Sequence, residues 1–269
     1  MVVCYGSQRY KPSVDRKIHK SQNIDQNAPL GPQVYQILKQ GIVEADYLPG
    51  DRASEVKIAR QLQVSRQPVR EAFIRLQSEG LLDIRPQRGT FVNKISVEAV
   101  LNARFLREAI EADIIALVAS DQNPRVIAKL RKQLKAQYKV SESNPIRFMK
   151  MDDLFHRSLA EAAEKNHAWQ VIEELKTQMD RVRILSFNHF HMAQLIDQHT
   201  DIVDAIESGR ANDAVNHIRK HLREILTSLP TISREKPEFF DTANTEFASY
   251  STVVLPRSTK QKTGDKNVS

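Results

Sequence analysis

Residues 62–80 constrain the fold more than any other stretch, because they describe a short helix with both ends marked. Ser65 stands where a capping side chain is expected, and Pro68 falls in the first turn, where a missing N–H costs nothing. Gly80 is a typical C-terminal stop. Between them, apolar residues recur at the spacing of one helical face: Val69, Ala72, Phe73 and Leu76. The pattern predicts a helix that packs on a core through this face.

The opposite face of this helix presents Arg66, Gln67 and Arg70. Arginine and glutamine in the first turns of a short helix suit bidentate contacts with base edges and contacts with phosphates in a DNA major groove. The alternative is an ordinary surface helix with solvated charges. The flanking segments have to decide between the two interpretations.

The flanks predict a winged helix-turn-helix. A first amphipathic helix carries Val34, Ile37, Leu38 and Ile42 and ends at the Leu48–Asp51 turn, and a second helix starts from Ser54. After residue 80, two strands at 81–85 and 90–93 enclose the turn 86–89. The hairpin tip can approach a minor groove or the DNA backbone. The predicted DNA-binding residues are Ser65, Arg66, Gln67, Pro68, Arg70, Gln87, Arg88 and Gly89.

From Val97 onward the apolar period is helical, and Asn-Pro, Asn-His and Ser-Gly pairs separate the segments. We expect an all-α bundle of six helices at about 97–120, 124–140, 145–164, 168–186, 190–208 and 211–228. The fold class is therefore mostly α, with a small β-hairpin wing. The domains are expected at 28–94 and 96–229, between a disordered leader (1–27) and a mostly disordered tail (230–269) in which Phe239-Phe240 or Tyr250–Leu255 can still pack.

Charge and cysteine usage narrow the possible partners and the cellular compartment of the protein. Residues 28–95 carry ten Lys or Arg against seven Asp or Glu, whereas residues 96–229 carry nineteen of each. The positive excess thus lies in the N-terminal third, where a polyanion would dock. The only cysteine is Cys4, and neither a signal-peptide core nor a membrane-spanning apolar run is present. We expect a cytoplasmic protein without a membrane partner.

A second set of polar residues points to a metal. Asp152 and His156 are four residues apart and share a helix face. His199 and His221 lie ten residues before and twelve residues after Gly209, so two antiparallel helices would bring them to similar heights. One carboxylate and three imidazoles suit a divalent metal. A chance i, i+4 pair remains the alternative, and His217 and Asp153 are rival ligands.

Arg104 and Glu108 form another i, i+4 pair, on the first bundle helix. One interpretation is a surface ion pair worth a few tenths of a kcal/mol. The other turns Arg104 into the bundle, where its guanidinium would hold the carboxylate of a ligand.

Several motifs together resemble a known family. Pro49-Gly50-Asp51, Val64–Ala72, Glu79-Gly80-Leu81 and Arg88–Val92 are similar to the winged-helix signature of GntR regulators. Arg104 with Glu108, Asp152-x-x-x-His156, and His199 with Ile202 and Ala205 before His221, resemble the FCD effector domain of the FadR subfamily. Six helices fit its VanR-like branch. Val56 stands where some relatives have a DNA-contacting arginine.

The resemblance implies that Asp152, His156, His199 and His221 are the metal ligands, with zinc expected and nickel or manganese as alternatives. It implies a ligand-responsive transcription regulator, a repressor of a catabolic operon, that binds a palindromic operator as a homodimer and responds to a small carboxylate effector held with the help of Arg104. A metal-dependent hydrolase or lyase with a basic accessory module is the alternative, since such a site also suits an enzyme. A helical scaffold that binds no nucleic acid is a third possibility, which the hairpin wing disfavours.

Overall fold

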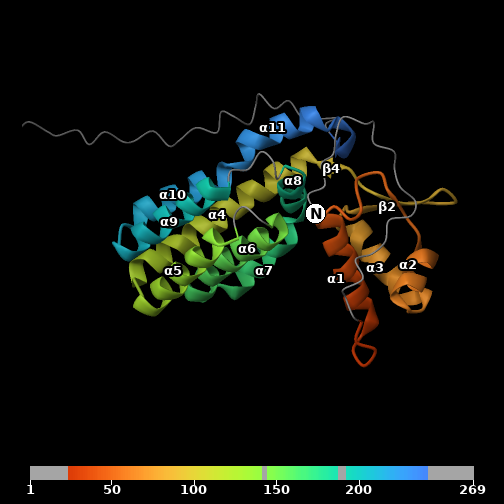
Figure 1. The fold of residues 1–269 in the computed structure, drawn as a ribbon, viewed down its shortest axis with the longest axis horizontal. Helices are drawn as coiled ribbons and strands as arrows, with labels where there is room; N and C mark the ends of the chain where they lie inside the picture. Colours follow the sequence, from red (N-terminus) through yellow and green to blue (C-terminus); the bar gives the residue numbers. More distant parts are fainter. Residues whose placement is uncertain (1–23, 141–143, 187–191, 242–269) are drawn as a thin grey trace, which may run out of the picture.

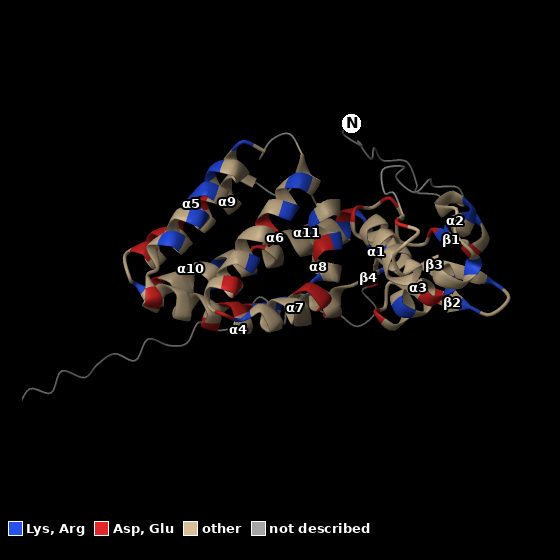
Figure 2. Ribbon diagram, turned by 90° about the horizontal axis from the view of Figure 1, so that it is seen from below, with Lys and Arg blue, Asp and Glu red and all other residues tan. Residues whose placement is uncertain are grey.

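The computed structural model describes residues 24–140, 144–186 and 192–241. A winged-helix part and a longer helical bundle lie end to end (Figures 1 and 2), which confirms the mostly α class. No helix in these ranges combines the length and the apolar character needed to traverse a lipid bilayer. Nearly all of the leader, and the tail beyond Asp241 with Tyr250–Leu255, lie outside the described residues, so their expected disorder stays a prediction.

The winged-helix part closes around one apolar core, to which Val69, Phe73 and Leu76 contribute from the expected face. Its three strands form an antiparallel sheet in the order β1-β3-β2, in which Leu82 pairs with Val92. Ser65 occupies the N-cap position of α3, but its side chain makes no capping hydrogen bond, contrary to expectation. The elements are α1 (Leu30–Val43), β1 (Arg52–Ala53), α2 (Glu55–Leu62), α3 (Arg66–Ser78), β2 (Leu82–Arg85) and β3 (Gly89–Val92).

A cluster of four polar side chains holds α3 against α1, and we call it the polar clasp: Tyr35, Lys39, Arg75 and Glu79. Glu79, the last residue of the α3 region, accepts hydrogen bonds from the Tyr35 hydroxyl (2.5 Å) and from Lys39 Nζ (2.9 Å). Arg75 stacks over the Tyr35 ring at 3.8 Å. Burial opposes ionisation of Glu79, but the two hydrogen bonds outweigh it and lower the pKa of this carboxyl. The clasp therefore sets the angle at which the exposed face of α3 is presented.

The bundle differs from the expected six helices because two of the expected helices are each divided. The fourth is interrupted at Lys176 and the sixth at Glu224, although both residues keep right-handed helical backbone angles. At Glu224 the backbone tightens to i→i+3 hydrogen bonds, which interrupts the regular α-helical pattern. The described helices are α4 (Val97–Asp121), α5 (Pro124–Tyr138), α6 (Pro145–Ala162), α7 (Asn166–Leu175), α8 (Thr177–Leu185), α9 (Met192–Glu207), α10 (Ala211–Arg223) and α11 (Ile225–Glu235).

The expected start of the tail at Pro230 is wrong for residues 230–241. Pro230 lies inside α11, and a 3₁₀ turn (Pro237–Phe239) and strand β5 (Phe240–Asp241) follow. β5 pairs in parallel with β4 (Ile95–Ser96), the link between the two parts. Phe239 and Phe240 are buried in a core beside Ile232, so apolar burial outweighs the helix-breaking tendency of the proline.

Helix α8 joins the bundle to the winged-helix part. Arg181 is buried, and its Nη2 donates to the carbonyl oxygen of Asn93, just after β3 (2.7 Å). Burial lowers the pKa of Arg181 to about 9. Arg183, two residues further along α8, contacts Asp152 in the polar centre of the bundle that is described below. The same helix therefore contacts both the winged-helix part and this polar centre.

Candidate metal centre and DNA-binding surface

The outer face of α3 carries the expected polar side chains. Arg66, Gln67 and Arg70 are exposed, whereas Pro68 is buried and offers no side chain to DNA. Arg66 Nη2 forms an ion pair with Glu55 on α2 (3.0 Å), and Gln67 Nε2 donates to Glu71 (3.0 Å). Arg70 is therefore the most readily available donor of the three, since the other two must exchange a partner to contact a base.

At the tip of the wing lies a further arginine, Arg52. Gln87 and Arg88 are exposed, and Gln87 has a left-handed backbone (φ 60°). Gly89 has φ 107°, and a Cβ there would lie 2.8 Å from Arg52 Nε. The positive φ favours glycine at this position, and a Cβ would displace the Arg52 guanidinium group from the tip. The sequence interpretation missed Arg52, since the pairing of β1 with β3 is a long-range contact.

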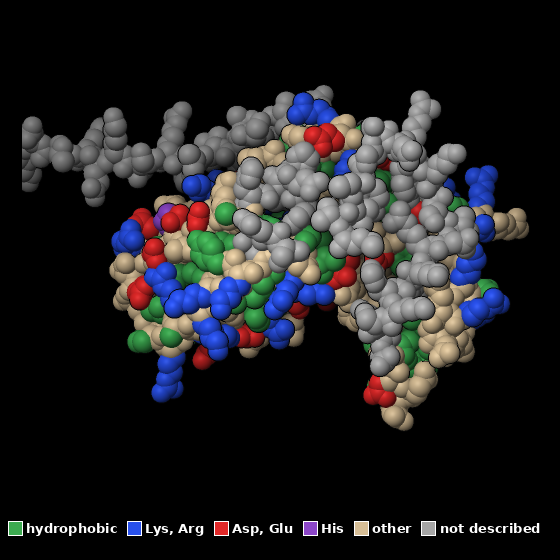
Figure 3. Space-filling view, in the orientation of Figure 1, with side chains coloured by type: hydrophobic (Ala, Val, Ile, Leu, Met, Phe, Trp, Pro, Cys, Tyr) green, Lys and Arg blue, Asp and Glu red, His purple; other side chains and the backbone are tan. Residues whose placement is uncertain are grey.

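Figure 3 shows Lys and Arg side chains along the edge of the molecule where Figure 1 has α2 and β2. Exposed guanidinium groups in this part come from both the helices and the wing: Arg52, Arg60, Arg66, Arg70 and Arg88. A surface of this kind can neutralise phosphates without specifying a sequence, and α3 carries the groups that the sequence predicts to read bases.

In the bundle, the structure brings together the four residues expected to bind metal. Asp152 and His156 come from α6, His199 from α9 and His221 from α10, and all four are buried. One ligand atom from each lies within 4.8 Å of all the others. The His221 Nε2 atom is 3.2 Å from the Nε2 atoms of His156 and His199, and Asp152 Oδ1 is 3.4 Å from His199 Nε2.

An outer layer of hydrogen bonds orients these side chains. The Nδ1 atom of each histidine faces an oxygen that can only accept: Glu111 Oε2 for His156 (2.5 Å), Gln137 Oε1 for His199 (3.0 Å) and Gln198 Oε1 for His221 (3.0 Å). The second oxygen of Asp152 accepts from Arg183 Nη1 (2.8 Å). Each Nδ1 must therefore carry the proton, which leaves every Nε2 with a free lone pair directed at the centre.

These residues fit a divalent metal. Asp152 Oδ1 is buried without a hydrogen-bond partner, and the lone pairs of three Nε2 atoms converge on the same space, so four acceptors share no donor. Burial lowers the pKa of His199 to about 3 and holds the pKa of His221 well below its usual value, so both imidazoles are neutral, as metal ligands must be. Arg183 and the histidines outweigh burial and hold the pKa of Asp152 well below its usual value.

The two rival ligands lie elsewhere. Asp153 points away from the cluster and accepts from Lys176 Nζ (2.8 Å). His217 is partly exposed, with Nδ1 4.0 Å from Asp201. The 100° step between neighbouring helix positions places Asp153 on a different face from Asp152, as the helical period requires.

Arg104 is turned into the bundle. It is buried and ion-paired with Glu108 (2.5 Å), which also accepts from Arg219 and Arg223, while Arg104 Nε has no partner among the described residues. Arg107, one turn further along α4, is also buried, is ion-paired with Glu111, and leaves Nη2 without a partner in the same part of the chain.

Arg107, Glu111 and Arg183 were not anticipated from the sequence, although α4 carried a usable signal. Its inward stripe is apolar at Val97, Val100 and Leu101 and again at Ile115, but Arg104, Arg107, Glu108 and Glu111 continue it at i, i+3, i+4 and i+7. Charged residues that occupy core positions at this spacing indicate a buried polar site. Gln137, Gln198 and Arg183 had no comparable signal.

Comparisons with known proteins agree with both halves of this description. The model of bacterial regulatory proteins of the gntR family matches residues 30–92, and the FCD domain matches residues 103–224. The HTH-type transcriptional repressor RspR of Escherichia coli K12 is 40% identical over 220 residues, which cover 81% of this chain and 96% of that protein. A regulator from the unstable DNA locus of Streptomyces ambofaciens is 31% identical over 78% of this chain and 89% of its own.

Solved structures share the fold. Escherichia coli McbR/YncC has a TM-score of 0.64 at 19% identity and covers 77% of this chain and 99% of its own. A GntR regulator from Rhodococcus sp. RHA1 has a TM-score of 0.61 at 23% identity, covering 75% and 96%. The alternative of a hydrolase or lyase is thereby overturned, because the relatives are transcription regulators. The chain belongs to the GntR family of bacterial regulatory proteins and is a transcription regulator with a DNA-binding GntR domain and an FCD effector domain.

Proposed function

We propose that this regulator is a homodimeric repressor of a catabolic operon whose DNA affinity is set by a small organic acid bound at a metal in the FCD domain. The observation that carries the proposal is the buried Asp152, His156, His199 and His221 cluster, in which four acceptor atoms converge and every histidine is oriented by an outer oxygen. Zinc suits this ligand set best, with nickel or manganese as alternatives.

An acid effector is favoured by the unpaired guanidinium atoms beside the cluster. A carboxylate that binds the metal needs further donors, and Arg107 Nη2 is a buried donor without a partner among the described residues. Arg107 lies one turn from Glu111, which touches His156. Arg104 lies seven residues from Glu111, about 10 Å along the helix. A short acid would therefore use Arg107, and only a longer acid, such as a dicarboxylate, would also reach Arg104.

Helix α8 supplies a route from the effector to DNA. Arg183 contacts the carboxylate of Asp152, and Arg181 on the same helix holds the Asn93 carbonyl at the end of the wing. A shift of α8 on effector binding would thus move the winged-helix part. The effector can change operator affinity only by its differential affinity for the two arrangements, typically about 1–3 kcal/mol.

A homodimer on a palindromic operator follows from the size of α3, which alone reads too few base pairs. Exposed apolar side chains on α4, among them Phe105, Leu106 and Leu117, offer a surface for a second copy. The repressor role rests on relatives: RspR is named a repressor, and a protein of Paenarthrobacter nicotinovorans, 28% identical, is described as a probable repressor of D-xylose utilization.

The decisive experiment measures metal content by mass spectrometry together with operator binding, with and without a panel of mono- and dicarboxylic acids, after selection of the operator from genomic fragments. We expect one metal per chain and an acid that changes operator affinity at least fivefold. Arg107→Gln should weaken the response to every acid, whereas Arg104→Gln should weaken the response to long acids only. Full metal occupancy after replacement of His156, His199 and His221 by alanine would refute the metal centre. An unchanged response to acids in both arginine variants would refute the proposed binding of the effector carboxylate by Arg107 and Arg104.

A further inference from the structure

Two segments that lie outside both matched family domains meet at the junction of the winged-helix part and the bundle. Residues 93–102 link the GntR match to the FCD match, and residues 225–241 follow the FCD match. They meet where β4 pairs with β5, with Ile95 opposite Phe240. Figure 1 shows α11 running from the bundle toward β4. The C-terminal segment 225–241 therefore ends on the linker between the two domains.

An apolar core surrounds this junction and contains side chains from both domains. Phe239 and Phe240 are 3% and 2% exposed. The same cluster includes Leu48, from the turn after α1, and Val182, from α8. Burial of two aromatic side chains is strongly favourable, so the C-terminal segment is held at the junction by its own apolar residues.

A polar contact ties the same segment to α8. Lys236 Nζ donates to the carbonyl oxygen of Leu185, the last residue of α8 (3.1 Å). A cation at this position also suits the negative end of the helix dipole. Because Arg181 of α8 donates to the Asn93 carbonyl at the start of the linker, α8 contacts both the linker and the C-terminal segment.

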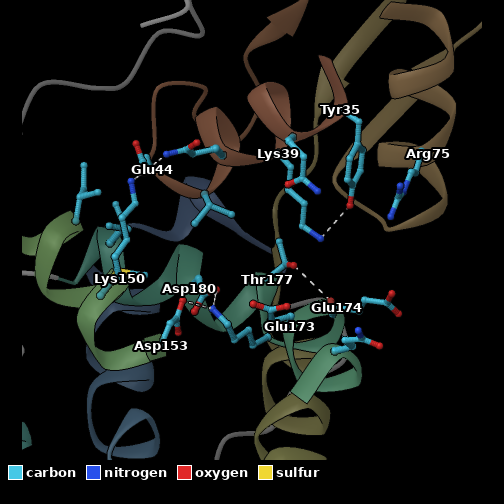
Figure 4. Close-up of a pocket in the computed structure, with 18 residues that line it drawn as sticks. Tyr35, Lys39, Glu44, Arg75, Lys150, Asp153, Glu173, Glu174, Thr177 and Asp180 are labelled. Atoms are coloured by element: carbon cyan, nitrogen blue, oxygen red, sulfur yellow. Dashed lines mark hydrogen bonds and ion pairs between the residues drawn. The ribbon is translucent and has the colours of Figure 1, made fainter. Parts of the chain in front are cut away.

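Away from this core, the two domains face each other across a cleft of about 730 Å³. Helix α1 forms one wall, and α6, α7 and α8 form the other (Figure 4). The ion pair between Lys150 and Glu44 (3.1 Å) crosses the cleft at one end, and the Lys150 side chain is 62% exposed. An exposed ion pair contributes little to stability. The cleft thus leaves room for the winged-helix part to turn about the β4–β5 junction.

The start of the C-terminal segment is connected to the candidate metal centre. Helix α10 carries His221 and is interrupted at Glu224, directly before α11. Gln198 joins these two residues, because its Oε1 atom faces His221 Nδ1 (3.0 Å) and its Nε2 atom donates to Glu224 Oε2 (3.1 Å). A movement of His221 would therefore be passed to the residue at which the segment starts.

We propose that residues 225–241 form an interdomain strap. Docked on β4 and α8, the strap fixes the angle of the winged-helix part, and its release lets that part turn into the cleft. Operator affinity is high only while the strap is docked, because a fixed angle pre-organises the recognition helix for DNA. Control of the strap by the effector, through Gln198 and Glu224, rests on the proposed function, whereas the docking of the strap does not.

The test combines hydrogen exchange, read by mass spectrometry on the full chain with zinc present, with operator binding. In Phe239→Ala/Phe240→Ala, the amides of residues 94–97 should exchange at least tenfold faster than in wild type, while those of α3 and α10 keep their wild-type rates. Operator affinity should fall at least fivefold, and an acid that changes wild-type affinity should lose its effect. Phe239→Leu/Phe240→Leu keeps apolar side chains at both positions and should restore linker protection and operator affinity.

The matched control is Phe148→Ala, which removes a buried phenylalanine from a separate cluster with Leu195 and Ile196. It destabilises the bundle without touching the strap, so the exchange of residues 94–97 relative to α10 should stay as in wild type. If the double variant loses protection in α3 and α10 as well, Phe240→Ala alone is judged by the same criteria.

Three results would overturn the strap: unchanged exchange of residues 94–97 in the alanine variants, equally fast exchange there in Phe148→Ala, or wild-type operator affinity with an unprotected linker. A wild type that responds to no acid would contradict the proposed function alone, because exchange and operator binding measure the strap without any acid.

Discussion

Removal of the metal should destabilise the effector domain strongly. Without an ion, Asp152 Oδ1 and three Nε2 lone pairs face one another in the buried interior, with Nε2 atoms 3.2 Å apart and no donor among the described residues to satisfy them. An unsatisfied buried polar group costs about 1–3 kcal/mol. The centre also ties α6, α9 and α10 together, so its loss weakens contacts between helices that are far apart in sequence.

The expected magnitude follows from linkage. A metal at 100 to 1,000 times its dissociation constant stabilises the folded state by about 2.7–4.1 kcal/mol. For a domain of this size, each kcal/mol shifts the melting temperature by about 3 °C. Excess chelator should therefore lower the Tm of the effector domain by about 8–12 °C, and added zinc should restore it. Scanning calorimetry, with metal content measured on the same samples, gives both quantities.

Matched variants make this prediction refutable. His199→Ala should begin near the Tm of the stripped wild type and gain little from added zinc. His167→Ala removes an exposed imidazole that is hydrogen-bonded only to Gln170 in the described structure, so it should respond to chelator as the wild type does. An unchanged Tm in chelator, for wild type that demonstrably lost its metal, would show that the buried acceptors do not depend on an ion.

Three further predictions concern other residues. Arg70→Ala should weaken operator binding by about 1–3 kcal/mol if the guanidinium contacts a base, and a loss that is equal on unrelated DNA would identify a phosphate contact instead. The folded state lowers the pKa of Glu79, so its contribution of about 1 kcal/mol is complete at neutral pH, begins to fall near pH 4.5 and is lost as the pH falls through the lower pKa of the folded state. Glu79→Gln should abolish that part of the acid dependence of unfolding. Glu111→Gln should reduce metal affinity about 10–100-fold while retaining the fold, because it weakens the hydrogen bond that orients His156. Dialysis against a competing chelator measures this change.

Much of the architecture could be predicted from local patterns in the sequence. The apolar stripe of Val69 and Phe73, the stop at Gly80 and the turn at 86–89 are short-range signals, and the structure has α3 and the β2–β3 hairpin where they predict them. The i, i+4 spacing of Asp152 and His156 likewise follows from the helical period alone. The positions of His199 and His221 about Gly209 needed only the assumption of an antiparallel helix pair, which α9 and α10 form.

The remainder depended on contacts between segments that are distant in sequence. Phe239 and Phe240 are buried because β5 pairs with β4, nearly 150 residues earlier. The polar composition around them therefore led to the wrong prediction that residues 230–241 belong to a disordered tail. Arg183 reaches Asp152, and Gln137 reaches His199, only through the packing of separate helices. Sequence alone therefore determined most of the helices, the wing and the residue types of the candidate metal centre, since these follow from local periodicity and side-chain chemistry. Tertiary structure decided which buried oxygens and guanidinium groups surround the candidate metal centre, because burial and hydrogen-bond partners arise only when distant segments pack.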